Sequence, residues 1–414
     1  MKRTLAVLTL SICLSAAARA QNLVDFSRNT TLSASQINER IAKNFGASVL
    51  PRATQNVDLF KVRYNSRDER GRNVVLSGLL ALPITSAPKG LVIFNHGTMA
   101  DRATSPSRFG GESKLSETQL ATLAFASGGY AVVMPDYLGL GDHNGAHPYP
   151  LGSINARSAI DIINPARQII ARRGVRVGSR LFVSGYSEGG AVSMWTVRTL
   201  ERENNPNLRV FSAANLSGPY DLSGVTRQSM LSSTNKTEEF MPRLYLLAYM
   251  VYYQHKTNGT KLTKYFKPAM ANTVYNAFGR NVSDENIIKR MALTATLMRA
   301  QNRLDRVLDA RFLRALRTND DREPIVRALK QNDTFSWSPR TPQLLVAVQS
   351  DTILTSQNTT KTLRTMRARG VGANVVRQII VRNNKLDHVS FMPQALVIAR
   401  RFFDGGFAAV SGAQ

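Results

Sequence analysis

Short runs of bulky apolar residues alternate along most of the chain with longer segments of helical periodicity. Six such runs predict buried strands at residues 90–94, 130–135, 180–184, 208–213, 343–348 and 375–381. Apolar positions at helical spacing predict helices at residues 154–172, 356–369 and 392–403. Because strands that alternate with helices form parallel sheets covered on both faces, the pattern predicts an α/β fold.

The N-terminal part of the chain departs from this alternation. We expect residues 21–50 to form one short helix, at about 33–44, and otherwise to be a lead-in. Two β-rich runs within residues 58–82 flank a polar loop, which predicts an antiparallel hairpin at the edge of the sheet. Pro165 is expected to kink the helix 154–172, because proline has no amide hydrogen.

Between residues 226 and 339 the alternation stops. Helical patterns continue there without a convincing strand, for example at Leu304, Val307, Leu308, Phe312, Ala315 and Leu316. An insertion of this size predicts a helical cap on a core made of residues 21–225 and 340–414. Its most apolar stretch, residues 243–254, is expected to fill the core of the cap or to line an acyl pocket.

The five residues Gly185-Tyr186-Ser187-Glu188-Gly189 follow one predicted strand directly and precede a helical pattern. A strand, a sharp turn and a helix are the setting in which G-x-S-x-G exposes a nucleophilic serine. The helix N-terminus after Ser187 favours developing negative charge through its amides and dipole. We therefore interpret Ser187 as a catalytic nucleophile.

A nucleophilic serine requires a histidine base and an acid that orients it. Asp351 follows the predicted strand 343–348, and His388 follows the strand 375–381 after a short loop. Open α/β sheets place their sites at the carboxyl ends of strands, where both residues would lie. The order Ser187, Asp351, His388 is that of serine hydrolases with this strand arrangement.

Further motifs carry a family resemblance: Asn95-His96-Gly97-Thr98, residues 135–141, His147-Pro148-Tyr149 and residues 217–222. With the serine, acid and histidine motifs they resemble α/β-hydrolase-fold esterases and lipases, above all the secretory lipase family and related bacterial acyl hydrolases. The resemblance covers nearly all of the mature chain. It implies the α/β-hydrolase fold with an inserted helical cap, and it makes the amides of Thr98 and Glu188 the oxyanion donors. The acid loop differs from the commonest pattern, since Ala347-Val348 stands where His-Gly usually precedes the acid.

Other polar residues compete for these roles. Asp136 precedes Ser187 in the chain and looks like part of a structural turn. Asp142, His143 and His147 are too loosely spaced for a metal site, so we interpret them as residues that fix a loop or line the cleft. His255, in the cap, is interpreted as structural, and replacement of any of the three histidines should keep most activity. No metal and no cofactor is implied.

Composition adds a basic charge and an export signal. The formal net charge is +26, carried mainly by scattered arginines. It indicates either a solvated surface or attraction to anionic membranes and polymers, and no nucleic-acid-binding module accompanies it. Residues 1–20 read as a signal peptide cleaved after Ala20, which would remove the one cysteine, Cys13. We expect an exported, soluble, periplasmic or secreted product.

The expected activity is hydrolysis of a small-molecule or lipid-like carboxylic ester through an acyl-enzyme. A serine peptidase or amidase would use the same three residues, so it stays open. A non-catalytic binding protein on the same fold would be expected to have lost a member of the triad, and here every position is filled.

Overall fold

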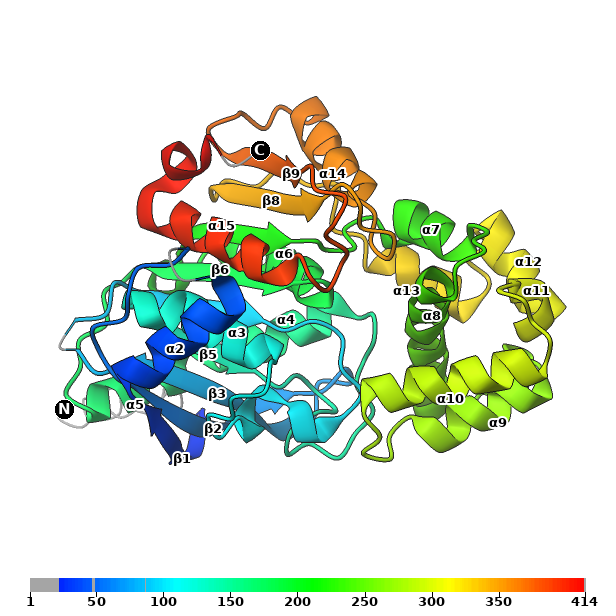
Figure 1. Cartoon of the computed structure of the whole chain (residues 1–414), viewed down its shortest axis with the longest axis horizontal. Coiled ribbons are helices and arrows are strands. Elements are labelled where there is room, and N and C mark those ends of the chain that lie inside the picture. The colour runs from blue at the N-terminus through cyan, green and yellow to red at the C-terminus, as the bar shows by residue number, and fades with distance from the viewer. Residues whose placement is uncertain (1–21, 47–48, 86, 413–414) are drawn as a thin grey trace, which may run out of the picture.

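The computed structural model describes residues 22–46, 49–85 and 87–412. The predicted signal peptide lies outside these ranges. At the centre is a nine-stranded sheet with the strand order β1-β2-β3-β5-β4-β6-β7-β8-β9 (Figure 1). The strands are β1 (Leu23–Leu32), β2 (Val57–Arg67), β3 (Asn73–Pro83), β4 (Leu91–Asn95), β5 (Ala131–Pro135), β6 (Leu181–Tyr186), β7 (Val210–Leu216), β8 (Gln343–Val348) and β9 (Val376–Val381).

Strands β5, β4, β6, β7, β8 and β9 run parallel, whereas β1, β2 and β3 are joined to one another and to β5 in antiparallel register. All six predicted buried strands are present, with small shifts at their ends. Every residue of β4, β5, β6 and β8 is buried, as expected for parallel strands covered on both faces.

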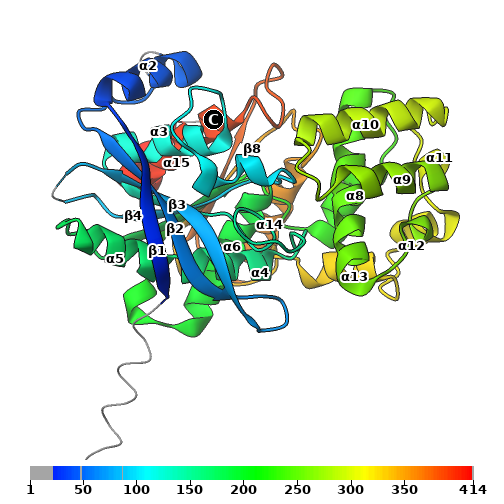
Figure 2. The ribbon, with the colours of Figure 1, turned by 90° about the horizontal axis from the view of Figure 1, so that it is seen from below.

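Helices cover both faces of the sheet (Figures 1 and 2). Helices α2, α3 and α15 share one hydrophobic cluster with the sheet, and α4, α5, α6 and α14 share another. Their bounds are α2 (Ala34–Phe45), α3 (Glu117–Phe125), α4 (Gly152–Asp161), α5 (Ile163–Arg172), α6 (Glu188–Glu203), α14 (Gln357–Ala368) and α15 (Met392–Gly405). The predicted α/β architecture is therefore confirmed.

The prediction for the N-terminal segment was partly wrong. The expected helix is present as α2, capped by the Ser33 side chain, but the residues before it form the strand β1. β1 pairs along β2, so the predicted hairpin β2–β3 lies one strand inside the sheet edge. The alternation of β1 is weak because most of its side chains remain exposed or half-buried, and backbone pairing is what makes it a strand.

The single kinked helix expected at residues 154–172 is two helices, α4 and α5, separated at Ile162. Pro165 lies in the first turn of α5, where helix amides have no intrahelical acceptor and a missing hydrogen costs nothing. The chain breaks before the proline because residue 165 cannot donate to the carbonyl of Asp161.

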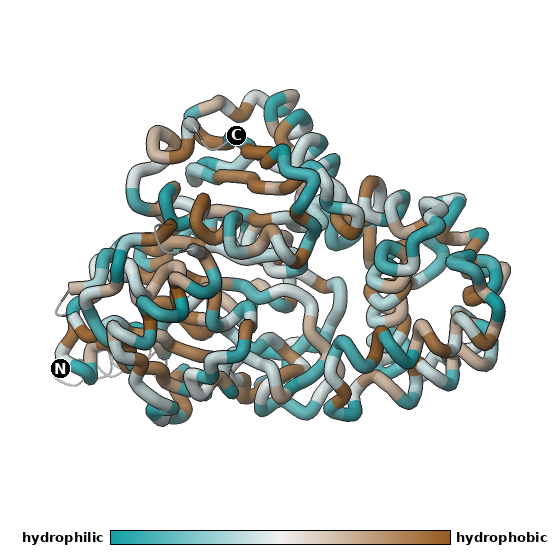
Figure 3. The backbone as a smooth tube through the Cα atoms, in the orientation of Figure 1, coloured by the Kyte–Doolittle hydropathy of each residue, from teal (hydrophilic) through white to brown (hydrophobic). Residues whose placement is uncertain are grey.

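The helices α7 to α13, here called the helical region, lie beyond the carboxyl ends of the parallel strands (Figure 1). A third hydrophobic cluster fills this region around α8, and Figure 3 colours the hydrophobic residues along the backbone tube brown. The helices are α7 (Arg227–Leu231), α8 (Thr237–Asn258), α9 (Pro268–Ala277), α10 (Asp284–Leu297), α11 (Leu304–Val307), α12 (Ala310–Thr318) and α13 (Pro324–Gln331). Within the described ranges, no helix combines the length and apolar character needed to cross a membrane.

Hydrogen bonds join the helical region to loops at the ends of strands. The Tyr249 hydroxyl donates to the Met99 carbonyl at 2.9 Å, and the Asp284 carboxylate accepts the Ala100 amide at 2.7 Å. These contacts hold α8 and α10 against the loop that follows β4, so the helical region packs directly on the ends of the parallel strands.

We predict that Phe182→Ala in β6 lowers the free energy of unfolding by about 3–5 kcal/mol, because the ring is 1% exposed and packs on Tyr130 and Phe403. The neighbouring Phe211, which is 50% exposed, is the matched control, and Phe211→Ala should cost less than about 1 kcal/mol. Urea denaturation of both variants measures the difference, and equal losses would contradict this account of the core.

Candidate active site

The turn between β6 and α6 holds Ser187 in a conformation that side chains rarely adopt, with φ 57° and ψ −123°. The Ser187 amide donates to the Leu216 carbonyl at the end of β7, at 3.0 Å. On the other side, Gly189 passes so close to β4 that an added Cβ would lie 1.9 Å from the Asn95 carbonyl oxygen. The turn is thus clamped between two neighbouring strands, which leaves its serine side chain projecting from the strand ends.

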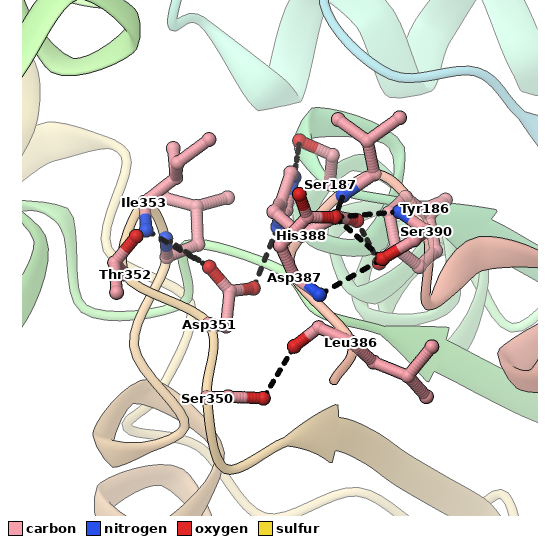
Figure 4. Close-up of polar contacts among 12 residues, drawn as sticks. Tyr186, Ser187, Ser350, Asp351, Thr352, Ile353, Leu386, Asp387, His388 and Ser390 are labelled. Atoms are coloured by element: carbon pink, nitrogen blue, oxygen red, sulfur yellow. Dashed lines mark hydrogen bonds and ion pairs between the residues drawn. The ribbon is translucent and has the colours of Figure 1, made fainter. Parts of the chain in front are cut away.

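The structure brings together the three residues that the sequence pairs as nucleophile, base and acid (Figure 4). His388 Nε2 lies 2.9 Å from Ser187 Oγ, and His388 Nδ1 lies 2.6 Å from Asp351 Oδ2. Asp351 is 3% exposed and His388 is 8% exposed. With Nδ1–H donating to the carboxylate, Nε2 of the neutral ring can accept the serine proton.

Asp351 is fixed by its own loop. Its second carboxylate oxygen, Oδ1, accepts the amides of Ile353 at 2.9 Å and Leu354 at 2.8 Å. The acid therefore has partners for both oxygens, and only Oδ2 faces the imidazole. The Ala347-Val348 departure from the common acid motif lies in β8 and does not change where the carboxylate points.

Side chains that the sequence did not single out tie the loops of the site together (Figure 4). The Tyr186 hydroxyl donates to the His388 carbonyl at 2.5 Å. The Ser350 hydroxyl, beside the acid, donates to the carbonyls of Leu386 and Asn383 in the histidine loop. No sequence spacing signals these bonds, because each joins residues more than thirty positions apart.

Arg243 reaches the acid loop from the helical region. Its guanidinium donates twice to the Thr352 carbonyl, from Nε at 3.0 Å and from Nη2 at 2.6 Å. The buried position of Arg243 in α8 makes these donors costly to leave unpaired. Helix α8 thus helps to fix the loop that carries Asp351, besides filling its own hydrophobic cluster.

Two other aspartates have partners elsewhere. Asp136 is buried and accepts the Ser77 hydroxyl at 2.5 Å and the Ser107 amide at 2.8 Å, while burial raises its pKa. Asp387 accepts the hydroxyl and amide of Ser390, and these bonds hold the pKa of Asp387 below its usual value. Each of these carboxylates fixes a turn, and it is the Asp351 carboxylate that accepts the hydrogen bond from His388 Nδ1.

The two predicted oxyanion residues both adjoin the nucleophile. Glu188 is the first residue of α6, directly after Ser187. Thr98 follows Gly97, at which an added Cβ would lie 3.3 Å from the Ser187 Cβ. Amides at a helix N-terminus lack intrahelical acceptors, so this corner offers donors to a negative oxygen.

The Glu188 side chain forms a buried polar cluster that sequence reasoning missed. Its Oε1 lies 3.0 Å from His147 Nε2 and accepts the Asn155 side-chain amide at 2.9 Å. His147 Nδ1 lies 3.1 Å from the Leu138 carbonyl, so both ring nitrogens face oxygen acceptors. The Tyr137 ring stacks beside the His147 ring, with 5.8 Å between their centroids.

The remaining polar residues of this loop have separate partners. His143 Nδ1 accepts the amides of Gly139 and Gly145, each at 3.1 Å. Asp142 forms ion pairs with Lys61 at 2.7 Å and Arg108 at 2.8 Å. In the described part of the chain, no group of three His, Cys, Asp or Glu side chains is arranged to hold a metal ion.

A cavity of about 730 Å³ opens between the β2–β3 hairpin, the loop after β5 and helix α8. Ala100, Leu138, His147 and Tyr249 form its inner wall, and Arg102 and Lys256 are among the charged residues that line it. The triad does not line this cavity. His147 separates it from the turn of Ser187, through the contact with Glu188 described above.

The sheet order, the two helix layers and the serine turn after β6 define an α/β-hydrolase fold. The Secretory lipase family model matches residues 110–232. No curated protein sequence matches the chain.

Solved structures with similar folds include esterases, a lipase and a hydrolase. A putative hydrolase from Legionella pneumophila has 24% identity and a TM-score of 0.79, with 95% of this chain and 100% of that chain covered. The rice cell wall degrading esterase LipA from Xanthomonas oryzae has 24% identity and a TM-score of 0.77, with coverage of 92% and 98%. Candida antarctica lipase A in its closed state has 15% identity and a TM-score of 0.61, with coverage of 93% and 82%. The family match, within a chain of this fold, supports a carboxylic-ester hydrolase.

We predict that His147→Ala lowers the free energy of unfolding by about 1–3 kcal/mol, because the buried Glu188 carboxylate loses its imidazole partner. His255→Ala is the control, since this half-buried ring contacts the Thr260 carbonyl at the end of α8 and should cost less than about 1 kcal/mol. Equal denaturation midpoints for the two variants would contradict the prediction.

Proposed function

We propose that this protein hydrolyses carboxylic esters through an acyl-enzyme, with Ser187 as nucleophile, His388 as general base and Asp351 as the acid that orients it. The observation that carries the proposal is the unbroken line of hydrogen bonds from Asp351 to His388 at 2.6 Å and from His388 to Ser187 at 2.9 Å. The match to the Secretory lipase family supports esters as the substrate class.

In the first half-reaction, Ser187 Oγ attacks the ester carbonyl carbon while His388 Nε2 accepts the serine proton. The Asp351 carboxylate stabilises the resulting imidazolium, and the amides of Thr98 and Glu188 stabilise the oxyanion. The tetrahedral intermediate then expels the alcohol, which takes the proton from His388. In the second half-reaction water attacks the acyl-enzyme by the same route and releases the acid.

The substrates we propose are small-molecule or lipid-like esters. Helix α8 carries buried tyrosines, among them Tyr245 and Tyr249, where the helical region faces the loop after β4. Apolar and aromatic side chains of this kind line the binding sites of lipid-like ligands, which supports the proposed substrate class. Export to the periplasm or the medium is proposed from the signal-like residues 1–20 and from the name of the matching family. The net charge of +26 supports attraction to anionic surfaces.

Ser187→Ala should abolish ester turnover, with a loss on the order of 10⁶-fold in kcat, because the variant has no nucleophile. We would measure p-nitrophenyl esters of increasing acyl length beside matched p-nitroanilides, together with labelling by a fluorophosphonate probe. The chain-length optimum reports the size of the acyl pocket. Faster turnover of anilides than of esters would change the reaction class to a peptidase or amidase. If the probe does not label the folded wild type, or if Ser187→Ala stays active, the assignment of Ser187 as the nucleophile is refuted.

Asp351→Asn should lower kcat by roughly 10⁴-fold, because an amide in place of the carboxylate no longer stabilises the catalytic tautomer or the imidazolium. Asp387→Asn is the matched control, since this residue precedes His388 and bonds only within its own turn in the described contacts. The control should keep most of its activity. Steady-state kinetics of both variants test the assignment, and the opposite ranking would make Asp387 the acid.

A further inference from the structure

Glu117, the first residue of α3, lies against the turn that precedes the proposed oxyanion residue. Both of its carboxyl oxygens are within hydrogen-bond distance of the Gly97 amide, at 3.0 Å and 2.9 Å. A Cβ added at Gly97 would lie 3.1 Å from Glu117 Oε2 and 3.3 Å from Ser187 Cβ. The carboxyl group and the nucleophile therefore approach the same side of one residue.

We propose that Glu117 is a positioning residue of the active site: its carboxyl group accepts the Gly97 amide and so holds the Gly97–Thr98 turn beside Ser187. This inference rests on the proposed function, because it assigns Glu117 a role in the same oxyanion site. Nothing in the sequence motif singles the residue out, since Glu117 stands twenty positions after Gly97 and outside the Asn95-His96-Gly97-Thr98 segment.

The positioning role follows from what the turn requires. The carbonyl side of Gly97 is held by the His96 ring, whose Nδ1 lies 2.7 Å from the Gly97 oxygen. Its amide is held by Glu117, so both polar groups of this glycine have side-chain partners. The next amide in the chain belongs to Thr98, and its direction is set once the Gly97 peptide is fixed. Oxyanion donors act through such preorganisation, and loss of one typically costs about 10²–10³-fold in kcat.

The protonation state follows from the surroundings of the carboxyl group. Although part of the residue remains exposed, the carboxyl itself is closely surrounded by protein. The titratable groups that face it are Glu188 of α6, Tyr186 at the end of β6 and Tyr137 after β5. Burial, and secondarily the Glu188 carboxylate, raise the pKa of Glu117 to about 8, against the opposing effect of the Gly97 amide.

His96 supplies no compensating charge, because burial lowers its pKa to about 4 and keeps the ring neutral. Below about pH 8, Glu117 is therefore an uncharged acid next to Ser187. Above that pH it becomes a carboxylate, and a negative charge at this position opposes the oxyanion that forms on attack. The activity should fall on the alkaline side for this reason, while His388 remains the base throughout.

The test is the pH dependence of Ser187-dependent ester hydrolysis for wild type, Glu117→Gln and Glu112→Gln. Glutamine keeps an oxygen acceptor for the Gly97 amide but cannot ionise. Glu112 is the matched control, because its two carboxyl oxygens accept the Gly110 amide at 3.1 Å in the same way on an exposed loop. Subtracting the rate of Ser187→Ala removes alkaline hydrolysis that the active site does not catalyse.

We expect kcat/KM of wild type and Glu112→Gln to fall about tenfold per pH unit above pH 8. Glu117→Gln should stay within about threefold of wild type at pH 7 and lack this fall up to about pH 9.5. Glu117→Ala, which lacks the acceptor, should lose at least about tenfold at every pH. An alkaline fall that is the same in Glu117→Gln as in wild type, or absent from wild type, would overturn the proposal.

A second measurement separates this inference from the proposed function. Between pH 4.5 and about 8 the folded chain keeps the Glu117 proton that the unfolded chain has lost, so raising the pH destabilises wild type. The melting temperature of Glu117→Gln relative to wild type should rise through this window and level off above it. If no ester is turned over, the proposed function fails, but the difference in melting temperature still tests the neutral carboxyl. A difference that does not change with pH refutes it.

Discussion

The close crossing of three chain segments at the end of β6 is the constraint on which the rest of this structure depends. Gly189 lies against the Asn95 carbonyl, where no Cβ fits, and the Ser187 amide bonds to the end of β7. The strained φ of Ser187 costs on the order of 1–3 kcal/mol and persists because strands on both sides hold it. The large buried sheet supplies that support, since β4, β6 and β7 are neighbours in one parallel array.

The remaining groups of the site are positioned by bonds between loops, which allows strand ends far apart in the chain to act as one unit. Ser350 joins the acid loop to the histidine loop, Tyr186 bonds to the His388 carbonyl, and Arg243 reaches Thr352 from the helical region. For the proposed reaction, Ser187, His388 and Asp351 held in this way would need little rearrangement. The helical region therefore contributes to the order of the site as well as to its walls.

Two carboxyl groups, those of Glu188 and Glu117, lie close to the turn of Ser187, and their hydrogen-bond partners differ. One oxygen of the Glu188 side chain, Oε1, has His147 and Asn155 as partners inside the protein. Glu117 has only the Gly97 amide among its described hydrogen bonds, and burial favours its neutral form. A neutral acid at Glu117 adds no negative charge beside the proposed oxyanion, whereas a carboxylate there would oppose it.

The sequence alone determined the parallel core and the order of Ser187, Asp351 and His388, because buried strands and the serine turn leave strong local patterns. It did not reveal β1, whose exposed side chains carry little periodicity, or the break between α4 and α5, which depends on how each helix packs against the sheet. The side-chain roles of Glu188, His147 and Glu117 were decided only by the tertiary structure. Each of them has a partner twenty or more positions away, and the burial of a side chain is a property of the folded chain.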